Sequence, residues 1–294
     1  MQKILGELVR IPDQYKEPAG QGGHVEKLVY QTYESMHYAE KTEQLTKTAY
    51  VYLPYGYSAD KQYDIFYMMH GGWGNETTYL GTDTEPSEWV NVLDHAIEDG
   101  KMKPFIVVCP TYNNTSPKDS GNKQLSLELN NNYHNELIHD LMPAAEGRYS
   151  TYAPSADRAG FAASRQHRLF GGFSMGCVAT LRTFEYCVDC FSYFIPTSGE
   201  RIDSGEHICQ MVRAAGYGPE DFFLYMASGS GDFAYERITA QIAEMMEAPD
   251  SLFVRADAEH PGNLSFLLQE GAVHDRAAAL QYTYNGLLNY FAAK

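Results

Sequence analysis

The sequence predicts an α/β fold in which a mostly parallel central sheet is covered by helices on both faces. The first apolar runs are typical of an antiparallel meander, and the later runs are continuously apolar, as expected of strands that are covered on both sides. Segments with helical periodicity lie between these later runs, which is the repeated strand–helix order of a parallel sheet. No linker or internal repeat interrupts the 294 residues, so we expect one domain over residues 1–294.

Eight alternating or continuous apolar runs are predicted as strands. In chain order they are Val25–Tyr33, Thr48–Leu53, Ile65–Met69, Phe105–Cys109, Leu169–Phe173, Phe191–Ile195, Phe222–Ala227 and Leu252–Arg255. Apolar residues at helical spacing predict the helices. These are a segment with Trp89, Leu93 and Ile97 on one face that ends at Gly100, a segment around Tyr133–Ala145, the segment after Ser174, Tyr235–Met246 and Arg276–Tyr290.

The stretch Tyr112–Asn132 is rich in Asn, Ser and Lys and is predicted as a long loop. It follows the strand Phe105–Cys109, and loops at the carboxyl ends of parallel strands border the ligand crevice of such folds. We therefore expect either a lid that faces a substrate or a plain surface excursion.

The composition excludes several classes of function. The 22 Lys and Arg residues against 38 Asp and Glu residues give a net charge of −16, which disfavours nucleic acids and anionic membrane surfaces as partners. No apolar run approaches the roughly 20 residues that cross a bilayer. The five cysteines include one pair, Cys187 and Cys190, at CxxC spacing, but no second ligand pair stands nearby. We predict no metal site and no cofactor.

Cellular location and assembly are less constrained by the sequence. Met1–Arg10 lacks the basic start and the apolar stretch of a signal peptide. We expect a secreted protein whose signal is absent or already removed, with a cytoplasmic protein as the alternative. Nothing in the sequence predicts the oligomeric state.

The chemistry centres on Gly172-Phe173-Ser174-Met175-Gly176, which fits the pattern G-x-S-x-G. The pattern lies between a predicted strand and a predicted helix, which is the context that a nucleophile elbow needs. In such an elbow the turn is so tight that small residues must flank the serine, and the serine oxygen projects above the sheet. We therefore predict Ser174 as a nucleophile.

A serine nucleophile needs a base, and in α/β-hydrolases the acid and then the histidine follow it along the chain. His274 lies between the last predicted strand and the last predicted helix, whereas His207 lies in a predicted helix. His260 is the competing candidate, a few residues beyond Leu252–Arg255.

The acid is expected after the strand Phe222–Ala227, where a glycine-rich loop carries Asp232. Asp257 and Asp275 are the alternatives, although a helix cap or a solvated charge is the more ordinary role for such residues.

Acyl transfer also needs donors to the developing oxyanion. His70-Gly71-Gly72-Trp73-Gly74 follows the strand Ile65–Met69 and resembles an HGG oxyanion loop. Glycines there let a backbone N–H approach the substrate. The N–H of Met175, the residue after the nucleophile, would complete the site.

Six segments in the correct order resemble the feruloyl esterase domains that are attached to bacterial xylanases, in carbohydrate esterase family 1 (esterase D-like α/β-hydrolases). The resemblance implies an α/β-hydrolase fold with Ser174 as nucleophile, His274 as base and Asp232 as orienting acid. It implies oxyanion donors from Gly72 or Trp73 and from Met175. The segments are Tyr52–Gly56, Met69–Thr77, Gly171–Cys177, Tyr193–Glu200, Met226–Tyr235 and Gly271–His274.

The resemblance further implies that the substrates are feruloyl or p-coumaroyl esters of plant cell-wall arabinoxylan or its oligosaccharides. We expect Trp73 and Tyr112 to border the acyl pocket, because a flat aryl group gains from an aromatic neighbour. The chain departs from the family at Cys177, where a glycine is common, and at Asp275 and Arg276, where aromatic residues often stand. The alternatives are an esterase for acetyl-xylan or for a thioester such as S-formylglutathione, and a non-catalytic carbohydrate-binding protein.

Overall fold

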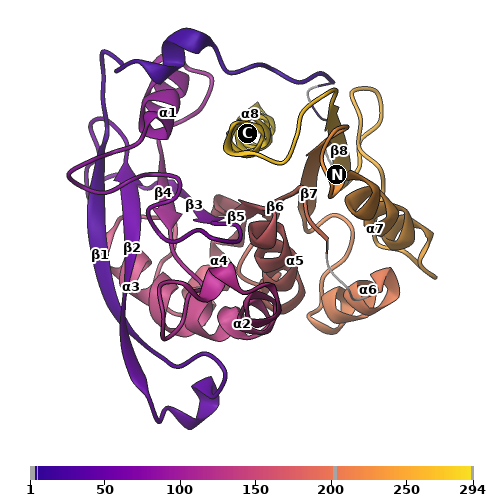
Figure 1. Cartoon of the computed structure of the whole chain (residues 1–294), viewed down its shortest axis with the longest axis horizontal. Coiled ribbons are helices and arrows are strands. Elements are labelled where there is room, and N and C mark those ends of the chain that lie inside the picture. The colour runs from indigo at the N-terminus through magenta and orange to yellow at the C-terminus, as the bar shows by residue number, and fades with distance from the viewer. Residues whose placement is uncertain (1–3, 5, 201–203, 293–294) are drawn as a thin grey trace.

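The computed structural model describes residues 4, 6–200 and 204–292. Within them a single eight-stranded sheet has the order β1-β2-β4-β3-β5-β6-β7-β8 (Figure 1). β1 and β2 pair antiparallel, as do β2 and β4, and every other neighbouring pair is parallel. The strands are β1 (His24–Tyr33), β2 (Gln44–Leu53), β3 (Asp64–Met69), β4 (Phe105–Cys109), β5 (Arg168–Phe173), β6 (Tyr193–Thr197), β7 (Phe223–Gly229) and β8 (Leu264–Gln269).

Helices cover both faces of this sheet, as predicted. α1 and α8 lie on one face and α2 to α7 lie on the other, and each face has its own cluster of buried apolar side chains (Figure 1). The helices are α1 (Glu88–Glu98), α2 (Lys123–Glu136), α3 (Met142–Arg148), α4 (Arg158–Ala163), α5 (Met175–Cys187), α6 (Gly205–Ala214), α7 (Tyr235–Glu247) and α8 (Arg276–Ala292), with a π-helical turn at Leu137–Leu141 and short 3-10 turns at Asp13–Lys16, Tyr38–Glu40, Asp119–Gly121 and Arg165–His167. None of the helices in the described part of the chain is both long and apolar enough to cross a bilayer.

One predicted strand is wrong. Leu252–Arg255 is extended, but apart from a single bridge between Arg255 and Leu264 it forms no ladder, and the last strand of the sheet is β8. The side chain of Asn263 accepts a hydrogen bond from the N–H of Val254 at 2.7 Å, so a side chain occupies the place of a ladder partner. An apolar run alone cannot distinguish these two neighbouring segments.

The polar stretch Tyr112–Asn132 is a loop only as far as its 3-10 turn, because α2 begins at Lys123. The side chain of Asn122 caps this helix by accepting a hydrogen bond from the N–H of Leu125 at 3.1 Å. The buried face of α2 includes the polar residues Ser126 and Asn130, so its periodicity is hidden in the sequence. α4 was not predicted either, because its six residues are too few for a periodic pattern.

The parallel strands bring four segments together at one edge of the sheet. The turns that follow β3, β5, β7 and β8 begin at His70, Ser174, Ser230 and Glu270. Because the carboxyl ends of parallel strands meet at the same edge, all the predicted catalytic motifs lie there.

Candidate active site

The turn between β5 and α5 has the geometry of an elbow. Ser174 has φ +61° and ψ −118°, a left-handed backbone that a residue with a side chain rarely adopts. A Cβ on Gly172 or Gly176 would come within 2.6 or 2.4 Å of the carbonyl oxygen of Met69, so only glycine lets β5 and α5 pack this closely on β3. The predicted strand–turn–helix context of Ser174 is therefore confirmed, with the strained residue at the predicted position.

His274 and Asp232 form a hydrogen-bonded pair across two loops. The imidazole Nδ1 lies 2.8 Å from Oδ1 and 2.9 Å from Oδ2 of Asp232, and because a carboxylate only accepts, Nδ1–H is the donor. The Asp232 side chain is 0% exposed and that of His274 is 17% exposed. Nδ1–H therefore points to the carboxylate, and in the neutral ring Nε2 carries the free lone pair.

Two aromatic rings contact the imidazole of His274. The ring of Phe173, the last residue of β5, lies 4.4 Å from the imidazole between centroids, and the ring of Phe233 lies at 4.2 Å. Asp232 also accepts a hydrogen bond from the N–H of Ala234 at 2.8 Å, which fixes the carboxylate. The orientation of the imidazole is thus set by a hydrogen bond at its edge and by two rings.

The competing candidates occupy local surface turns. His260 lies 3.1 Å from Asp257, three residues away, and their side chains are 72% and 49% exposed. Asp257 accepts from the backbone N–H groups of Glu259 and His260, and Asp275 caps α8 by accepting from the N–H of Ala278. Only the Asp232–His274 pair joins two of the predicted loops.

The His70–Gly74 turn lies against the elbow. A Cβ on Gly71 would come 3.3 Å from Cβ of Ser174. The N–H of Trp73 already donates to the carbonyl oxygen of Ser120 at 2.9 Å, which leaves Gly72 as the better candidate for an oxyanion donor in this turn. The N–H of Met175 is at the start of α5, where a helix has no intrahelical acceptor for its first N–H groups.

His70 is a buried support of this turn. Nδ1 lies 2.7 Å from the carbonyl oxygen of Gly71 and must donate to it, so Nε2 accepts from the hydroxyl of Thr111 at 2.7 Å. Burial lowers the pKa of His70 to about 4, which keeps the ring neutral near pH 7. No role was predicted for His70 from the sequence, although the HGG pattern contains it.

Tyr112 also supports the turn, whereas we expected it at the acyl pocket. It is buried, its ring stacks on His70 at 4.5 Å, and its hydroxyl donates to the carbonyl oxygen of Gly71 at 3.2 Å. Because its hydroxyl bonds to Gly71 and its ring stacks on His70, Tyr112 lies beneath the His70–Gly74 turn.

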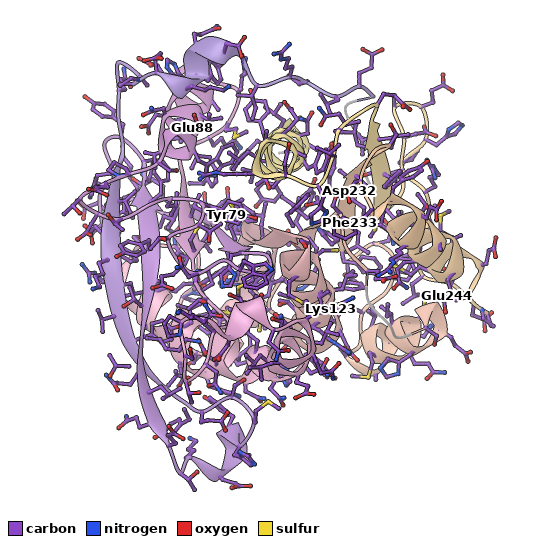
Figure 2. All side chains as sticks on the ribbon, viewed as in Figure 1. Tyr79, Glu88, Lys123, Asp232, Phe233 and Glu244 are labelled. Atoms are coloured by element: carbon purple, nitrogen blue, oxygen red, sulfur yellow. The ribbon has the colours of Figure 1, made fainter. Side chains whose placement is uncertain are left out.

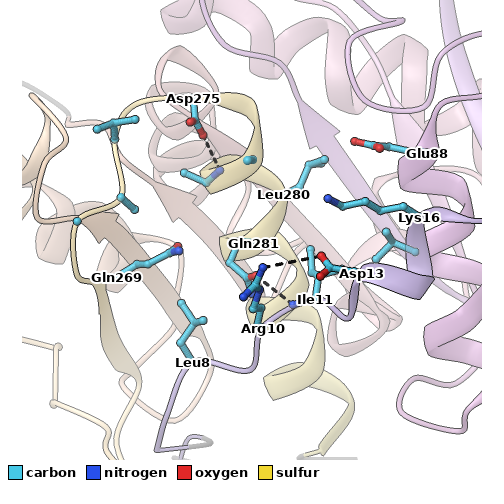
Figure 3. A pocket seen from close by; sticks show the side chains of 16 residues that line it. Leu8, Arg10, Ile11, Asp13, Lys16, Glu88, Gln269, Asp275, Leu280 and Gln281 are labelled. Atoms are coloured by element: carbon cyan, nitrogen blue, oxygen red, sulfur yellow. Dashed lines mark hydrogen bonds and ion pairs between the residues drawn. The ribbon is translucent and has the colours of Figure 1, made fainter.

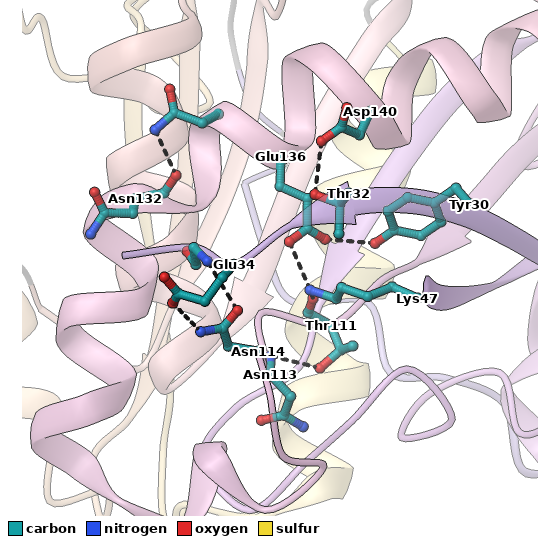
Figure 4. A network of polar contacts seen from close by, with 12 residues as sticks. Tyr30, Thr32, Glu34, Lys47, Thr111, Asn113, Asn114, Asn132, Glu136 and Asp140 are labelled. Carbon is teal, nitrogen blue, oxygen red and sulfur yellow. Dashed lines mark hydrogen bonds and ion pairs between the residues drawn. The ribbon is translucent and has the colours of Figure 1, made fainter. Parts of the chain in front are cut away.

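A buried polar network anchors the loop that carries Thr111 (Figure 4). Nζ of Lys47, on β2, donates to the carbonyl oxygen of Thr111 at 2.7 Å and to Glu136 at 2.8 Å. The hydroxyl of Tyr30, on β1, donates to the same carboxylate at 2.6 Å. Burial raises the pKa of Glu136, and the charge of Lys47 opposes that rise. The turn beside Ser174 is thereby tied to the interior through His70 and Thr111.

A cavity of about 160 Å³ adjoins Ser174. Its walls come from α2, α5 and the start of α7 and are largely apolar, with the Glu200–Arg237 ion pair at 2.9 Å. Figure 2 labels Phe233 beside Asp232, and Lys123 at the start of α2. Trp73 is not among the lining residues, which are Lys123, Leu127, Ser174, Met175, Val178, Ser198, Gly199, Glu200, Phe233, Ala234 and Arg237.

Most of these cavity residues were missed by the sequence analysis. Lys123 and Leu127 do lie in the stretch Tyr112–Asn132, which we expected to border the pocket, but as part of α2. Phe233 follows Asp232 directly and could have been found from that position. Ser198–Glu200 and Ala234 lie in segments that carry the family resemblance, but none was predicted to line a pocket, and no motif marks Val178 or Arg237.

A second hollow, of about 530 Å³, is lined in part by the residues on either side of His274 (Figure 3). It is bounded by the N-terminal segment, α1 and the first turns of α8, and it includes Arg10, Lys16, Glu88 and Asp275. Neither Ser174 nor Asp232 lines it. Across residues 4, 6–200 and 204–292, no three His, Cys, Asp or Glu side chains gather as a metal site would require.

Comparisons with known proteins agree with this geometry. The profile of the family described as "Putative esterase" matches residues 42–245. Endo-1,4-beta-xylanase Y of Acetivibrio thermocellus is 36% identical over 286 residues, which cover 95% of this chain and 24% of the xylanase. The chain thus spans about a quarter of the length of that relative.

Two solved structures resemble nearly the whole chain. One, described as FAE, is 35% identical, has a TM-score of 0.83, and the match covers 99% of this chain and 95% of the other. The second is a serine-to-alanine mutant of the feruloyl esterase module from Clostridium thermocellum, complexed with sinapinate. It is 34% identical with a TM-score of 0.81 and the same two coverages, 99% and 95%. The chain therefore belongs to the Putative esterase family and has the α/β-hydrolase fold of the feruloyl esterase modules, as its sequence motifs imply.

Proposed function

We propose that the chain is a serine esterase that hydrolyses hydroxycinnamate esters of plant cell-wall arabinoxylan. The observation that carries the proposal is the buried Asp232–His274 hydrogen bond at the sheet edge where the elbow holds Ser174. The structure described as a feruloyl esterase module supports the substrate class, because it is similar over nearly the whole chain. A polymeric cell-wall substrate is met outside the cell, so we propose a secreted enzyme.

In the first half of the reaction, Oγ of Ser174 attacks the ester carbonyl and Nε2 of His274 takes the hydroxyl proton. Asp232 holds the tautomer that makes Nε2 the acceptor and stabilises the imidazolium that forms. The N–H groups of Gly72 and Met175 donate to the oxyanion. When the tetrahedral intermediate collapses, His274 returns the proton to the alcohol oxygen of the sugar, and the acyl group remains on Ser174.

In the second half, water replaces the sugar alcohol. His274 removes a proton from this water, hydroxide adds to the acyl carbonyl, and the proton returns to Oγ of Ser174 as the carboxylic acid leaves. The products are one hydroxycinnamic acid and one free sugar hydroxyl, so no cofactor is consumed.

The 160 Å³ cavity is the proposed site of the acyl group. Its apolar side chains suit a flat aryl group, and Phe233 offers a ring whose centroid lies 4.2 Å from that of the His274 imidazole. A single acyl group is of the size that such a cavity holds, whereas a sugar chain must lie outside it.

Labelling with a fluorophosphonate, followed by peptide mapping, tests the nucleophile. We expect the label on the peptide that contains Ser174, and none on Ser174→Ala. A label on another serine in the wild-type protein would reassign the nucleophile.

Comparing methyl ferulate with methyl acetate, which has the same leaving alcohol, tests the acyl group. We expect a higher kcat/KM for methyl ferulate relative to methyl acetate, because only the aryl group fills the cavity. Equal values for the aryl and acetyl methyl esters would instead favour a short-acyl esterase.

A further inference from the structure

Trp73 is held in an unusual state at the rim of the site. Its φ is +64°, in the left-handed region that favours glycine, and its side chain is 87% exposed. A strained backbone and a large apolar ring in water both cost free energy, so a purely structural role would not maintain this arrangement. Residues of this kind are concentrated at ligand contacts.

The conformation of Trp73 is fixed by the facing loop. Its N–H donates to the carbonyl oxygen of Ser120 at 2.9 Å, and the hydroxyl of Ser120 donates to the carbonyl oxygen of Gly74 at 2.7 Å. Asn113 joins the same loop to the turn, because its side chain accepts from the N–H of Ser120 and donates to the carbonyl oxygen of Gly74. The backbone on both sides of the indole is thereby held in place.

The indole itself lies against Gly121. A Cβ on Gly121 would come 2.9 Å from Cζ3 and 3.0 Å from Cε3 of Trp73, so the ring lies over a residue that has no side chain. One part of the ring is covered by this contact, and the rest remains in solvent. The result is a flat apolar platform that faces solvent on a backbone held by hydrogen bonds.

The platform is close to Ser174 but outside the acyl cavity. Two residues before Trp73, Gly71 packs against Ser174, and two residues after Gly121, Lys123 lines the cavity. Asn122 and Lys123, which follow Gly121 directly, are exposed polar residues. A substrate whose ester group lies at Ser174 would therefore extend over the indole of Trp73.

We infer that Trp73 binds a sugar ring of the glycan that carries the ester. The inference rests on the proposed function and names the part of the substrate that lies outside the cavity. A sugar ring has one apolar face that can stack on an indole, while its hydroxyls stay hydrated or bond to neighbouring polar groups. An aryl acyl group does not need to stay hydrated in this way, and it can bind against Phe233 and the apolar walls of the cavity.

The test compares Trp73→Ala, Trp73→Phe and wild type on methyl ferulate and on a feruloylated arabinoxylo-oligosaccharide. We expect Trp73→Ala to lower the ratio of kcat/KM for the oligosaccharide ester to kcat/KM for methyl ferulate about tenfold, mainly through KM. Trp73→Phe keeps a flat ring and should restore most of the ratio. An unesterified arabinoxylo-oligosaccharide should inhibit methyl ferulate hydrolysis by wild type more strongly than by Trp73→Ala.

Tyr55→Ala is the matched control. Tyr55 is also an exposed aromatic residue, but the register of β2 with β4 places it at the opposite edge of the sheet. This variant should leave the ratio unchanged. An equal loss on both substrates in Trp73→Ala, or no loss on either, would overturn the inference. Failure of wild type to hydrolyse methyl ferulate at all would count against the proposed function instead.

Discussion

Two groups at this site are held by hydrogen bonds from other loops: the imidazole of His274 by Asp232, and the N–H of Trp73 by the carbonyl oxygen of Ser120. The GxSxG pattern predicted Ser174, and the order of strands predicted His274 and Asp232, which the structure joins by a hydrogen bond. The donor N–H of Trp73, by contrast, is occupied by Ser120 from a loop about fifty residues away, which no local pattern reveals. Motifs predict residues whose role depends on their own turn, but not those whose role depends on a distant partner.

The role of Asp232 can be tested by its amide. Asp232→Asn keeps the shape of the side chain but can hold the wrong tautomer of His274, so kcat should fall by up to ~10⁴-fold with little change in KM. Steady-state kinetics on methyl ferulate would measure this. Asp257→Asn is the control, because its carboxylate pairs with the exposed His260, and it should keep near wild-type kcat. A collapse in Asp257→Asn with normal activity in Asp232→Asn would move the acid to the other loop.

His70 should make stability depend on pH. Burial lowers its folded-state pKa to about 4, below the ordinary value of histidine, so the unfolded chain binds the proton first as the pH falls. The stabilising effect of the neutral ring is complete above about pH 6.5 and is lost as the pH falls toward 4. Between pH 7 and pH 5 we expect His70 to account for a loss of about 2 kcal/mol in the free energy of unfolding.

Urea unfolding of wild type and His70→Asn at the two pH values measures this contribution. The variant should be less stable at pH 7 but should lose less stability on going to pH 5. If both proteins lose the same amount, the pH dependence belongs to other groups.

Among the elements, long strands and amphipathic helices were predictable, and segments whose partners are polar were not. Trp89, Leu93 and Ile97 indicated α1 because the helix packs an apolar face on the sheet. α2 buries Ser126, Asn130 and Glu136, so its inner face reads as polar in the sequence. The partners of that face, such as Lys47 for Glu136, lie on strands far away along the chain.

The contact between β2 and the end of α2 predicts a specific loss of stability. Lys47→Met would leave the carboxylate of Glu136 buried without its counter-charge, which typically costs about 3–5 kcal/mol. Thermal unfolding near pH 7 would show a lower midpoint. The double variant Lys47→Met/Glu136→Gln removes the buried charge as well, so it should recover part of the loss. A double variant that is less stable than Lys47→Met would show that the charge pair is not the source.

At the scale of the whole molecule, the order of strands and helices was sufficient to predict the fold class. The continuously apolar later runs indicated strands that are covered on both faces, and the two core clusters occupy those faces. The cavity beside Ser174 was not predictable, because its walls combine α2, α5, α7 and the segment after β6 through tertiary packing. Even so, the parallel topology alone was enough to place the three predicted residues, Ser174, Asp232 and His274, at one edge of the sheet.

The proposal that Ser174 is the nucleophile of a feruloyl esterase is tested by one measurement. This is the rate at which wild type and Ser174→Ala release ferulate from methyl ferulate. Only the nucleophile is lost in this variant, and Ser174 is a half-buried residue in a turn whose glycines remain, so the fold should be unchanged by circular dichroism. We predict efficient release by wild type and a fall in kcat of about 10⁶-fold in the variant. Retention of more than a few per cent of the activity by pure Ser174→Ala would contradict Ser174 as the nucleophile. No release of ferulate by wild type would contradict the proposed esterase activity.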